Sequence, residues 1–293
     1  MANDLSAFNA MAFSKKLIMN LDKLNVMMPL VNRDYEGEIQ NLGDSVTVRT
    51  LGSITVKPYT KNQATLDYED LAPDKEVMTV DDAQYFAFKV DDVDKAQTDM
   101  SVLDLYAERA AVSINDKIEA KLLSNYAAAH ADNKITGAAG AAIALDETNI
   151  YSYIVQARKR LNKQSVPTVG RWMVVDADTE SLLLQSDFFV KNGTESGARA
   201  AAEGQINGAA RPGFLGKVAG FDIYGSNNVP VVGGAKYIQF GNRWAISYAA
   251  QINKVERLRL QNTFADAVRG LLLHDTKVFD ECSKRFGTIK AEE

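Results

Sequence analysis

An unbroken helical pattern from Ser101 to Ala129 constrains the fold of this chain more than any other feature. The stretch contains no glycine or proline, and Asp99 or Ser101 can cap the free N–H groups at its start. Apolar residues recur along it at helical spacing: Leu103, Ala107, Ala110, Ile114, Ile118, Leu122 and Tyr126. Polar residues occupy the other side: Glu108, Arg109, Asn115, Asp116, Glu119 and Lys121. About 30 residues span roughly 45 Å, so the pattern predicts a structural spine longer than the typical helix of a compact domain. The alanine-rich, mixed spacing argues against a coiled coil.

In the segment before this helix, apolar residues recur at every second position. In Ser45–Thr50, Val46 and Val48 share one face and polar residues share the other. Similar β-branched and aromatic patterns predict further strands at 54–57, 75–80 and 85–90. The intervening segment 59–70 is too polar to bury much surface on its own. A long two-stranded excursion is marginally stable in water unless another surface covers it, so this region predicts a partner.

A second amphipathic pattern runs through residues 13–24, where apolar side chains recur at helical spacing. It ends before Pro29, which disfavours helix in the residue preceding it. The segment could be a helix docked on its own domain or an arm that packs on a neighbouring subunit. The sequence alone favours the first.

The chain after the long helix alternates between helical and strand patterns. A connector rich in small residues at 130–144 is a plausible domain boundary. Helices are predicted at 146–163, capped by Asp146 or Thr148, and at 178–185; strands are predicted at 172–175, 221–224, 236–240, 244–250 and 254–260. Six glycines within 191–216 predict a long mobile loop. A largely apolar run at 271–279 follows the last predicted strand.

Composition excludes several classes of function. Lys and Arg number 33 against 38 Asp and Glu, and a net charge of −5 supplies no long-range attraction to nucleic acid. One cysteine, Cys282, and two histidines cannot assemble a zinc finger or an iron–sulfur site, and a reducing compartment is expected. No span approaches the roughly 20 apolar residues that cross a bilayer, and the polar start does not resemble a secretory signal. The sequon Asn192–Thr194 is therefore interpreted as a polar loop.

Candidate catalytic groups are few. His130 ends the alanine-rich helix, where a cation suits the helix dipole, and His274 lies in a predicted strand, so both are interpreted as structural. Gly213–Lys217 is the nearest approach to a phosphate-binding loop, but it lacks the earlier glycine and the hydroxyl residue after the lysine.

Clustered carboxylates do not form a recognisable site either. The densest group is Asp91, Asp92, Asp94 and Asp99, which lacks the ligand order of a calcium loop. Strand-end charge, capping of the long helix and ionic contact with basic residues of another subunit are its expected roles. Asp34, Glu36 and Glu38 could be pictured as a glycosidase pair, but no sugar-binding cleft is indicated. We predict a non-enzymatic protein with no catalytic, cofactor-binding or metal-binding residues.

Three sequence segments are recognisable as a set: Leu30–Ile39 leading into Gly43–Val48, then Gly170–Asp178, then Gly216–Pro230. They stand within a fixed order of elements, which is a polar arm, a β excursion, a long helix, an α/β region with a glycine-rich loop, and returning strands. Together they resemble the major capsid protein of tailed bacteriophages, with the Hong Kong ninety-seven type fold. Nearly the whole chain is covered by the resemblance, and none of the three segments is a catalytic signature.

The resemblance implies an α+β fold of five segments. These are an N-terminal arm at 1–35, an extended β E-loop with its flanking strands at 36–90, a peripheral domain with the spine helix at 91–145, an α/β axial domain at 146–240, and strands returning to the peripheral domain at 241–293. The arm and the strand pair would leave surface that only neighbouring copies can cover.

The function implied by the resemblance is structural: self-assembly into pentamers and hexamers, and then into an icosahedral shell around double-stranded DNA. The implied partners are further copies, a separate scaffolding protein, a portal protein and packaged DNA contacted non-specifically, with assembly in the host cytoplasm and no cofactor or membrane. Lys57 and Lys61 lie in the E-loop region, but no cross-link can be assigned to either. The alternatives are an encapsulin-like compartment of the same fold and, in another class, a cytosolic enzyme with a pocket of converging polar groups.

Overall fold

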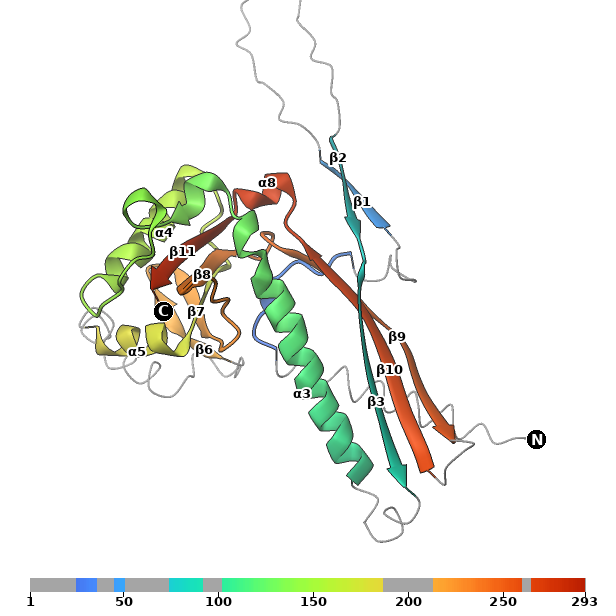
Figure 1. Cartoon of the computed structure of the whole chain (residues 1–293). Helices are drawn as coiled ribbons and strands as arrows, with labels where there is room; N and C mark the ends of the chain where they lie inside the picture. The colour runs from blue at the N-terminus through green and yellow to red at the C-terminus, as the bar shows by residue number, and fades with distance from the viewer. Residues whose placement is uncertain are drawn as a thin grey trace, which may run out of the picture.

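The computed structural model describes residues 25–35, 45–50, 74–91, 102–186, 213–259 and 265–292. The helices are α3 (Val102–Leu123), α4 (Ile150–Lys163), α5 (Ala177–Gln185) and α8 (Asp280–Ser283), with 3-10 turns η1 (Met28–Leu30), η2 (Ser124–Ala128), η3 (Ala131–Asn133) and η4 (Ala138–Gly140). The strands are β1 (Ser45–Thr50), β2 (Asp74–Thr79), β3 (Asp82–Asp91), β4 (Lys134–Ile135), β5 (Arg171–Val175), β6 (Phe214–Val218), β7 (Phe221–Gly225), β8 (Ala235–Asn242), β9 (Ser247–Arg259), β10 (Ala265–Lys277) and β11 (Phe286–Glu292). They form a two-stranded ladder β1–β2, a three-stranded sheet β3–β10–β9 and a six-stranded sheet β4–β11–β8–β5–β7–β6 (Figure 1).

The six-stranded sheet is covered on both faces. Successive residues of a strand point to opposite faces, and in β5 Met173 and Val175 join a core with α4 and α5. Trp172 and Val174 join a second core with the end of α3 and residues 26–31. All of β5 is therefore buried, as the continuous apolar run at 172–175 predicts.

The helices predicted after residue 100 form, but the spine helix ends at Leu123 and continues only as the 3-10 turn η2, and α4 begins later than predicted. The helix expected from residue 146 begins at Ile150, because Asp146 Oδ1 accepts hydrogen bonds from the N–H groups of Thr148 and Asn149, both 2.8 Å away. This turn uses Asp146 as a cap before the helix rather than inside it. The buried residues of α4, Ile150, Ile154, Ala157 and Leu161, are those of one helical face.

The three-stranded sheet is antiparallel and elongated, and α3 runs beside it (Figure 1). On its inner face, Phe86 and Leu272 pack with Ile114 and Ile118 of α3. The strands expected at 244–250 and 254–260 are one strand, β9. The polar residues between them mark a β-bulge: Leu271 pairs with Lys254 but Leu272 pairs with Ile252.

The sequence patterns do not predict the C-terminal strand, and the strands within 241–293 divide between two sheets. Strands β9 and β10 do lie in the three-stranded sheet. Strand β11 instead lies between β4 and β8 inside the six-stranded sheet. Two partners and two covered faces bury most of β11, which explains why its mixed sequence does not alternate cleanly.

Candidate assembly interface

Polar side chains of the spine helix and of the turn after it contact the three-stranded sheet; this group, Lys121, Asn125, Asp82, Asp275 and Thr276, is named here the polar clasp. Lys121 Nζ lies 2.6 Å from Asp82 Oδ2 and 3.5 Å from Asp275 Oδ1. The hydrogen bond between Lys121 and Asp82 lowers the pKa of Asp82 and raises the pKa of Lys121. One turn later, Asn125 Nδ2 donates to Thr276 Oγ1 over 2.8 Å. These contacts hold α3 against β3 and β10.

His274 lies beside this clasp in β10, within a strand as predicted. It is fully buried, and its ring centroid is 6.2 Å from that of Tyr248. Neither ring nitrogen has a hydrogen-bond partner among the residues described. Burial lowers the pKa of His274, so the ring is neutral at pH 7.

Glu119 joins the spine helix to two other segments. Its carboxylate accepts hydrogen bonds from the hydroxyl of Ser226, which follows β7, and from the backbone N–H of Val26. Burial raises the pKa of Glu119. The helical pattern placed Glu119 and Asn115 on the polar side, and this is wrong: each is only 4% exposed. The sheet covers one side of this part of α3 and residues 26–31 cover another, so two faces are buried rather than one.

Residues 25–32 of the predicted arm, apart from the exposed Pro29, are buried against their own chain. The Asn32 N–H donates to the Ile246 carbonyl over 2.9 Å, and the Tyr248 N–H donates to the Asn32 carbonyl over 2.8 Å. Met27 and Val31 join the core that includes α3. This part of the arm needs no neighbouring copy to shelter it, which corrects the expectation for 1–35. The amphipathic pattern at 13–24 lies outside the described residues.

The β1–β2 ladder extends away from the rest of the molecule, and β2 contacts the chain over its base at residues 76–80 (Figure 1). The Asp280 N–H donates to Glu76 Oε1 over 3.1 Å, and Lys277 Nζ donates to the Val77 carbonyl. Met78 and Val80 are buried against Leu273 and Phe279 at this base. Val77 is 38% exposed. The polar segment 59–70 lies outside the described residues.

The outer face of the three-stranded sheet is open beyond the base of this ladder. Tyr85, in the middle of β3, leaves 80% of its surface exposed. Along β3 from 82 to 89, exposed and half-buried residues alternate, and none is fully buried. Across the sheet, Arg269 donates two hydrogen bonds to Glu256 Oε2, at 2.8 and 2.6 Å, and Leu258 is 38% exposed. This surface, named here the outer face, includes an exposed tyrosine and an arginine, which are residue types enriched in protein–protein interfaces.

The residues considered for chemistry are placed apart. His130 is half-buried, and its Nδ1 accepts a hydrogen bond from the N–H of Asp132 over 3.3 Å. Lys217 lies in β6 and pairs with Asp222 at 3.1 Å, so Gly213–Lys217 is a strand and not a phosphate-binding loop. Burial raises the pKa of the Cys282 thiol.

The remaining candidates are only partly described. Asp34 is exposed and Asp91 ends β3. Outside the described residues lie Glu36, Glu38, Lys57, Lys61, Asp92, Asp94, Asp99 and the sequon at 192–194. Within the part of the chain that the structure describes, no three His, Cys, Asp or Glu side chains gather as a metal site would require. None of the helices described is long and apolar enough to cross a membrane.

The residues that shape this interface carry only weak signals in the sequence. Tyr85 could be found, because alternation in β3 puts it with Ala87 and Lys89 on the face opposite Phe86. Glu119 could not, because nothing local in the sequence indicates that a second segment covers its side of the helix.

Comparisons with known proteins agree on the fold. Among the solved structures that resemble the chain, three do so over most of both chains. That of Mycobacterium phage Che8 has a TM-score of 0.68 at 24% identity, covering 90% of this chain and 90% of that one. The capsid of Ralstonia phage GP4 has a TM-score of 0.70 at 13% identity, covering 92% and 89%. The capsid of cyanophage P-SCSP1u has a TM-score of 0.65 at 17% identity, covering 90% and 86%. These likenesses support an α+β fold of the Hong Kong ninety-seven type.

A sequence-level comparison identifies the family. No curated protein sequence matches the chain. The model of a family described as phage capsid protein matches residues 74–279, which run from β2 to the start of α8 and make up more than half of the 293 residues. The match includes the spine helix, the outer face and most of the six-stranded sheet. This chain therefore belongs to the phage capsid protein family, and it is a structural protein of the virion capsid.

Proposed function

We propose that many copies of this chain assemble into pentamers and hexamers, and that these close an icosahedral shell around double-stranded DNA. Membership of the phage capsid protein family supports the proposal. The observation that carries it is the outer face, where Tyr85 is 80% exposed in the middle of the edge strand β3. Covering such a surface with a neighbouring copy contributes about 25 cal/mol for each apolar Å² removed from water.

The segments keep the roles that the resemblance implies, as part of this proposal. Residues 36–90 act as the E-loop that lies over a neighbouring subunit, 91–145 as the peripheral domain and 146–240 as the axial domain. The β1–β2 ladder supports this role, since the described contacts of β2 with the rest of the chain are confined to its base at residues 76–80.

The proposal extends to partners and location. The chief partner is another copy of the chain, and a separate scaffolding protein, a portal protein and the packaged DNA are further partners. Assembly takes place in the host cytoplasm, and the protein has no enzymatic activity. We do not carry forward a compartment for cargo proteins, because the matching family is one of phage capsid proteins.

Electron microscopy of particles that contain this chain, purified from infected host cells, tests the proposal. We expect closed particles with five-fold and six-fold units, which protect encapsidated DNA from added nuclease. Deleting residues 59–70 should leave a folded chain that cannot close shells. Normal particles from this deletion would refute the E-loop role, and particles that hold only protein would refute the DNA container.

A further inference from the structure

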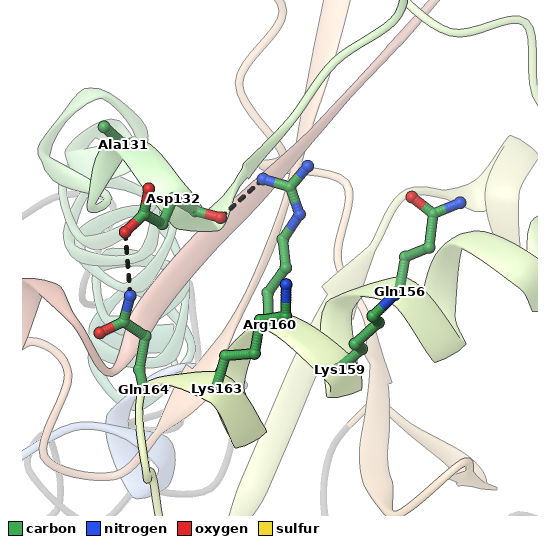
Figure 2. A pocket seen from close by; sticks show the side chains of 7 residues that line it. All are labelled: Ala131, Asp132, Gln156, Lys159, Arg160, Lys163 and Gln164. Carbon is green, nitrogen blue, oxygen red and sulfur yellow. Dashed lines mark hydrogen bonds between the residues drawn. The ribbon is translucent and has the colours of Figure 1, made fainter.

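A hollow of about 680 Å³ lies between α4 and the turn η3, on a part of the molecule separate from the outer face. Gln156, Lys159 and Lys163 line it from α4. Asp132 lines it from η3, and Arg160 reaches across between the two walls (Figure 2). The α4 residues stand at spacings of three and four, so they share one face of the helix, opposite its buried face.

The hollow carries uncompensated positive charge. Helix α4 contains no Asp or Glu but has Arg158, Lys159, Arg160 and Lys163, in a chain whose net charge is −5. Lys159 and Lys163 have no hydrogen-bond or ion-pair partner among the described residues, and they project from successive turns of α4 into the same hollow (Figure 2). Two ammonium groups are therefore available there to a negatively charged ligand.

Arg160 and Gln164 fix the shape of the hollow. Arg160 Nη1 donates to the carbonyl oxygens of Asp132, at 2.6 Å, and Lys134, at 2.8 Å. These carbonyls lie two residues apart where the edge strand β4 begins. Gln164 Nε2 donates to Asp132 Oδ2 over 3.1 Å. The two walls are thus held together, and the lysine ends remain free.

We propose that this hollow binds the carboxylates of an acidic peptide segment from another protein. Lys159 and Lys163 would each pair with a carboxylate, and the Gln156 amide can both donate to and accept from peptide groups. A nucleic acid backbone fits less well, because it needs a longer row of cations. The inference stands independently of the shell, since it concerns a surface of the single chain.

Fluorescence anisotropy tests the proposal on the full-length protein at low salt. The probes are a labelled hexaglutamate peptide, a labelled hexaglutamine peptide and a labelled 12-base-pair DNA duplex. We expect hexaglutamate to bind best, with an affinity that falls as salt is added. The double variant Lys159→Gln/Lys163→Gln should bind it roughly five- to tenfold more weakly, since it removes two ion pairs.

A charge-matched control distinguishes binding in the hollow from a general loss of positive charge on the protein. Arg158→Gln/Lys117→Gln removes two exposed positive charges outside the hollow, one of them from α4. It should leave hexaglutamate binding within about twofold of wild type. Equal losses in both double variants would overturn the proposal, as would stronger binding of the duplex through Lys159 and Lys163. Equal binding of hexaglutamine and hexaglutamate would also overturn it.

Discussion

The two larger sheets of this molecule differ in how far their faces are buried within the chain. In the six-stranded sheet, β5 is buried at every position, because α4 and α5 cover one face and the end of α3 with residues 26–31 covers the other. In the three-stranded sheet, β3 has no fully buried position from 82 to 89, and its outer face presents Tyr85 at 80% exposure. One sheet is completed within the chain and the other is not.

The largest loss of stability is expected from a charge introduced into the buried core at the spine helix α3. Ile118→Asp should prevent folding, because Ile118 is fully buried between the two sheets and the new charge would have no partner. Circular dichroism and solubility after expression measure this. Val112→Asp is the matched control on the same helix, since Val112 is 44% exposed and should cost no more than about 0.5 kcal/mol. A folded Ile118→Asp variant would show that the junction is not a core.

Two glycines provide a paired test of the closed and open sheets. A Cβ on Gly287 would lie 2.3 Å from the Phe240 ring and 2.9 Å from the Asn133 carbonyl, which is backbone. A Cβ on Gly270 would lie 2.3 Å from the Phe86 ring, and its close contacts belong to that ring alone. Phe86 is only half-buried and can swing aside, whereas Phe240 is fully buried.

We therefore expect Gly287→Ala to cost about 2–3 kcal/mol and Gly270→Ala about 1 kcal/mol. Urea denaturation with an unchanged m-value measures the two losses. Equal losses, or a larger loss at Gly270, would contradict the view that the three-stranded sheet is the looser of the two.

The share of the structure that the sequence predicts differs between these regions. Period-two alternation predicted β3 and the continuous apolar run predicted β5, because each signal is local. The helical period found the Ile114, Ile118 and Leu122 face of α3 for the same reason. It misplaced Glu119, since burial on a second side depends on Val26 and Ser226, which are distant in the sequence.

Local sequence patterns also do not predict which strands pair with each other. Strand β11 was missed because its place between β4 and β8 is set by non-local pairing, and Gly287 with Lys290 weakens its pattern. The bulge in β9 was interpreted as a break, because polar residues interrupt the alternation there. The candidate site was predicted only in kind, as surface for neighbouring copies, and the buried segment 25–32 was assigned to that surface wrongly.

Acid should weaken the spine–sheet contact through His274. Burial lowers the pKa of His274 in the folded chain, so the unfolded chain binds a proton first as the pH falls below about 6.5. The free energy of unfolding should therefore decrease from pH 7 towards pH 5, by up to about 1.4 kcal/mol per pH unit. Asp82 has a lowered pKa and so loses its contribution only at lower pH. Glu119, with a raised pKa, acts in the opposite direction.

Thermal unfolding at several pH values, in wild type and in His274→Met, isolates this effect. Asp82, Asp275, Lys121 and Glu119 are unchanged in the variant, so the difference between the two pH profiles reports on His274. The variant should have a shallower decrease in stability between pH 7 and pH 5. Parallel profiles would show that His274 has the same proton affinity in both states.

The smallest effect on stability is expected at the outer face. Tyr85→Ser should change the free energy of unfolding by no more than about 0.5 kcal/mol, because the side chain is 80% exposed. The same substitution should reduce the yield of particles in sedimentation velocity, because the ring is lost from the contact with a neighbour. A marked loss of stability with normal particle yield would reverse the comparison between the sheets.

Protection of residue 85 on assembly tests most directly whether neighbouring copies complete the open sheet. Tyr85→Cys in a Cys282→Ser background places the only thiol on the outer face, in the middle of the edge strand β3. Its labelling rate by a maleimide can be compared between unassembled chain and purified particles. We predict rapid labelling of the unassembled chain and strong protection in particles, whereas equally rapid labelling in both would contradict the account.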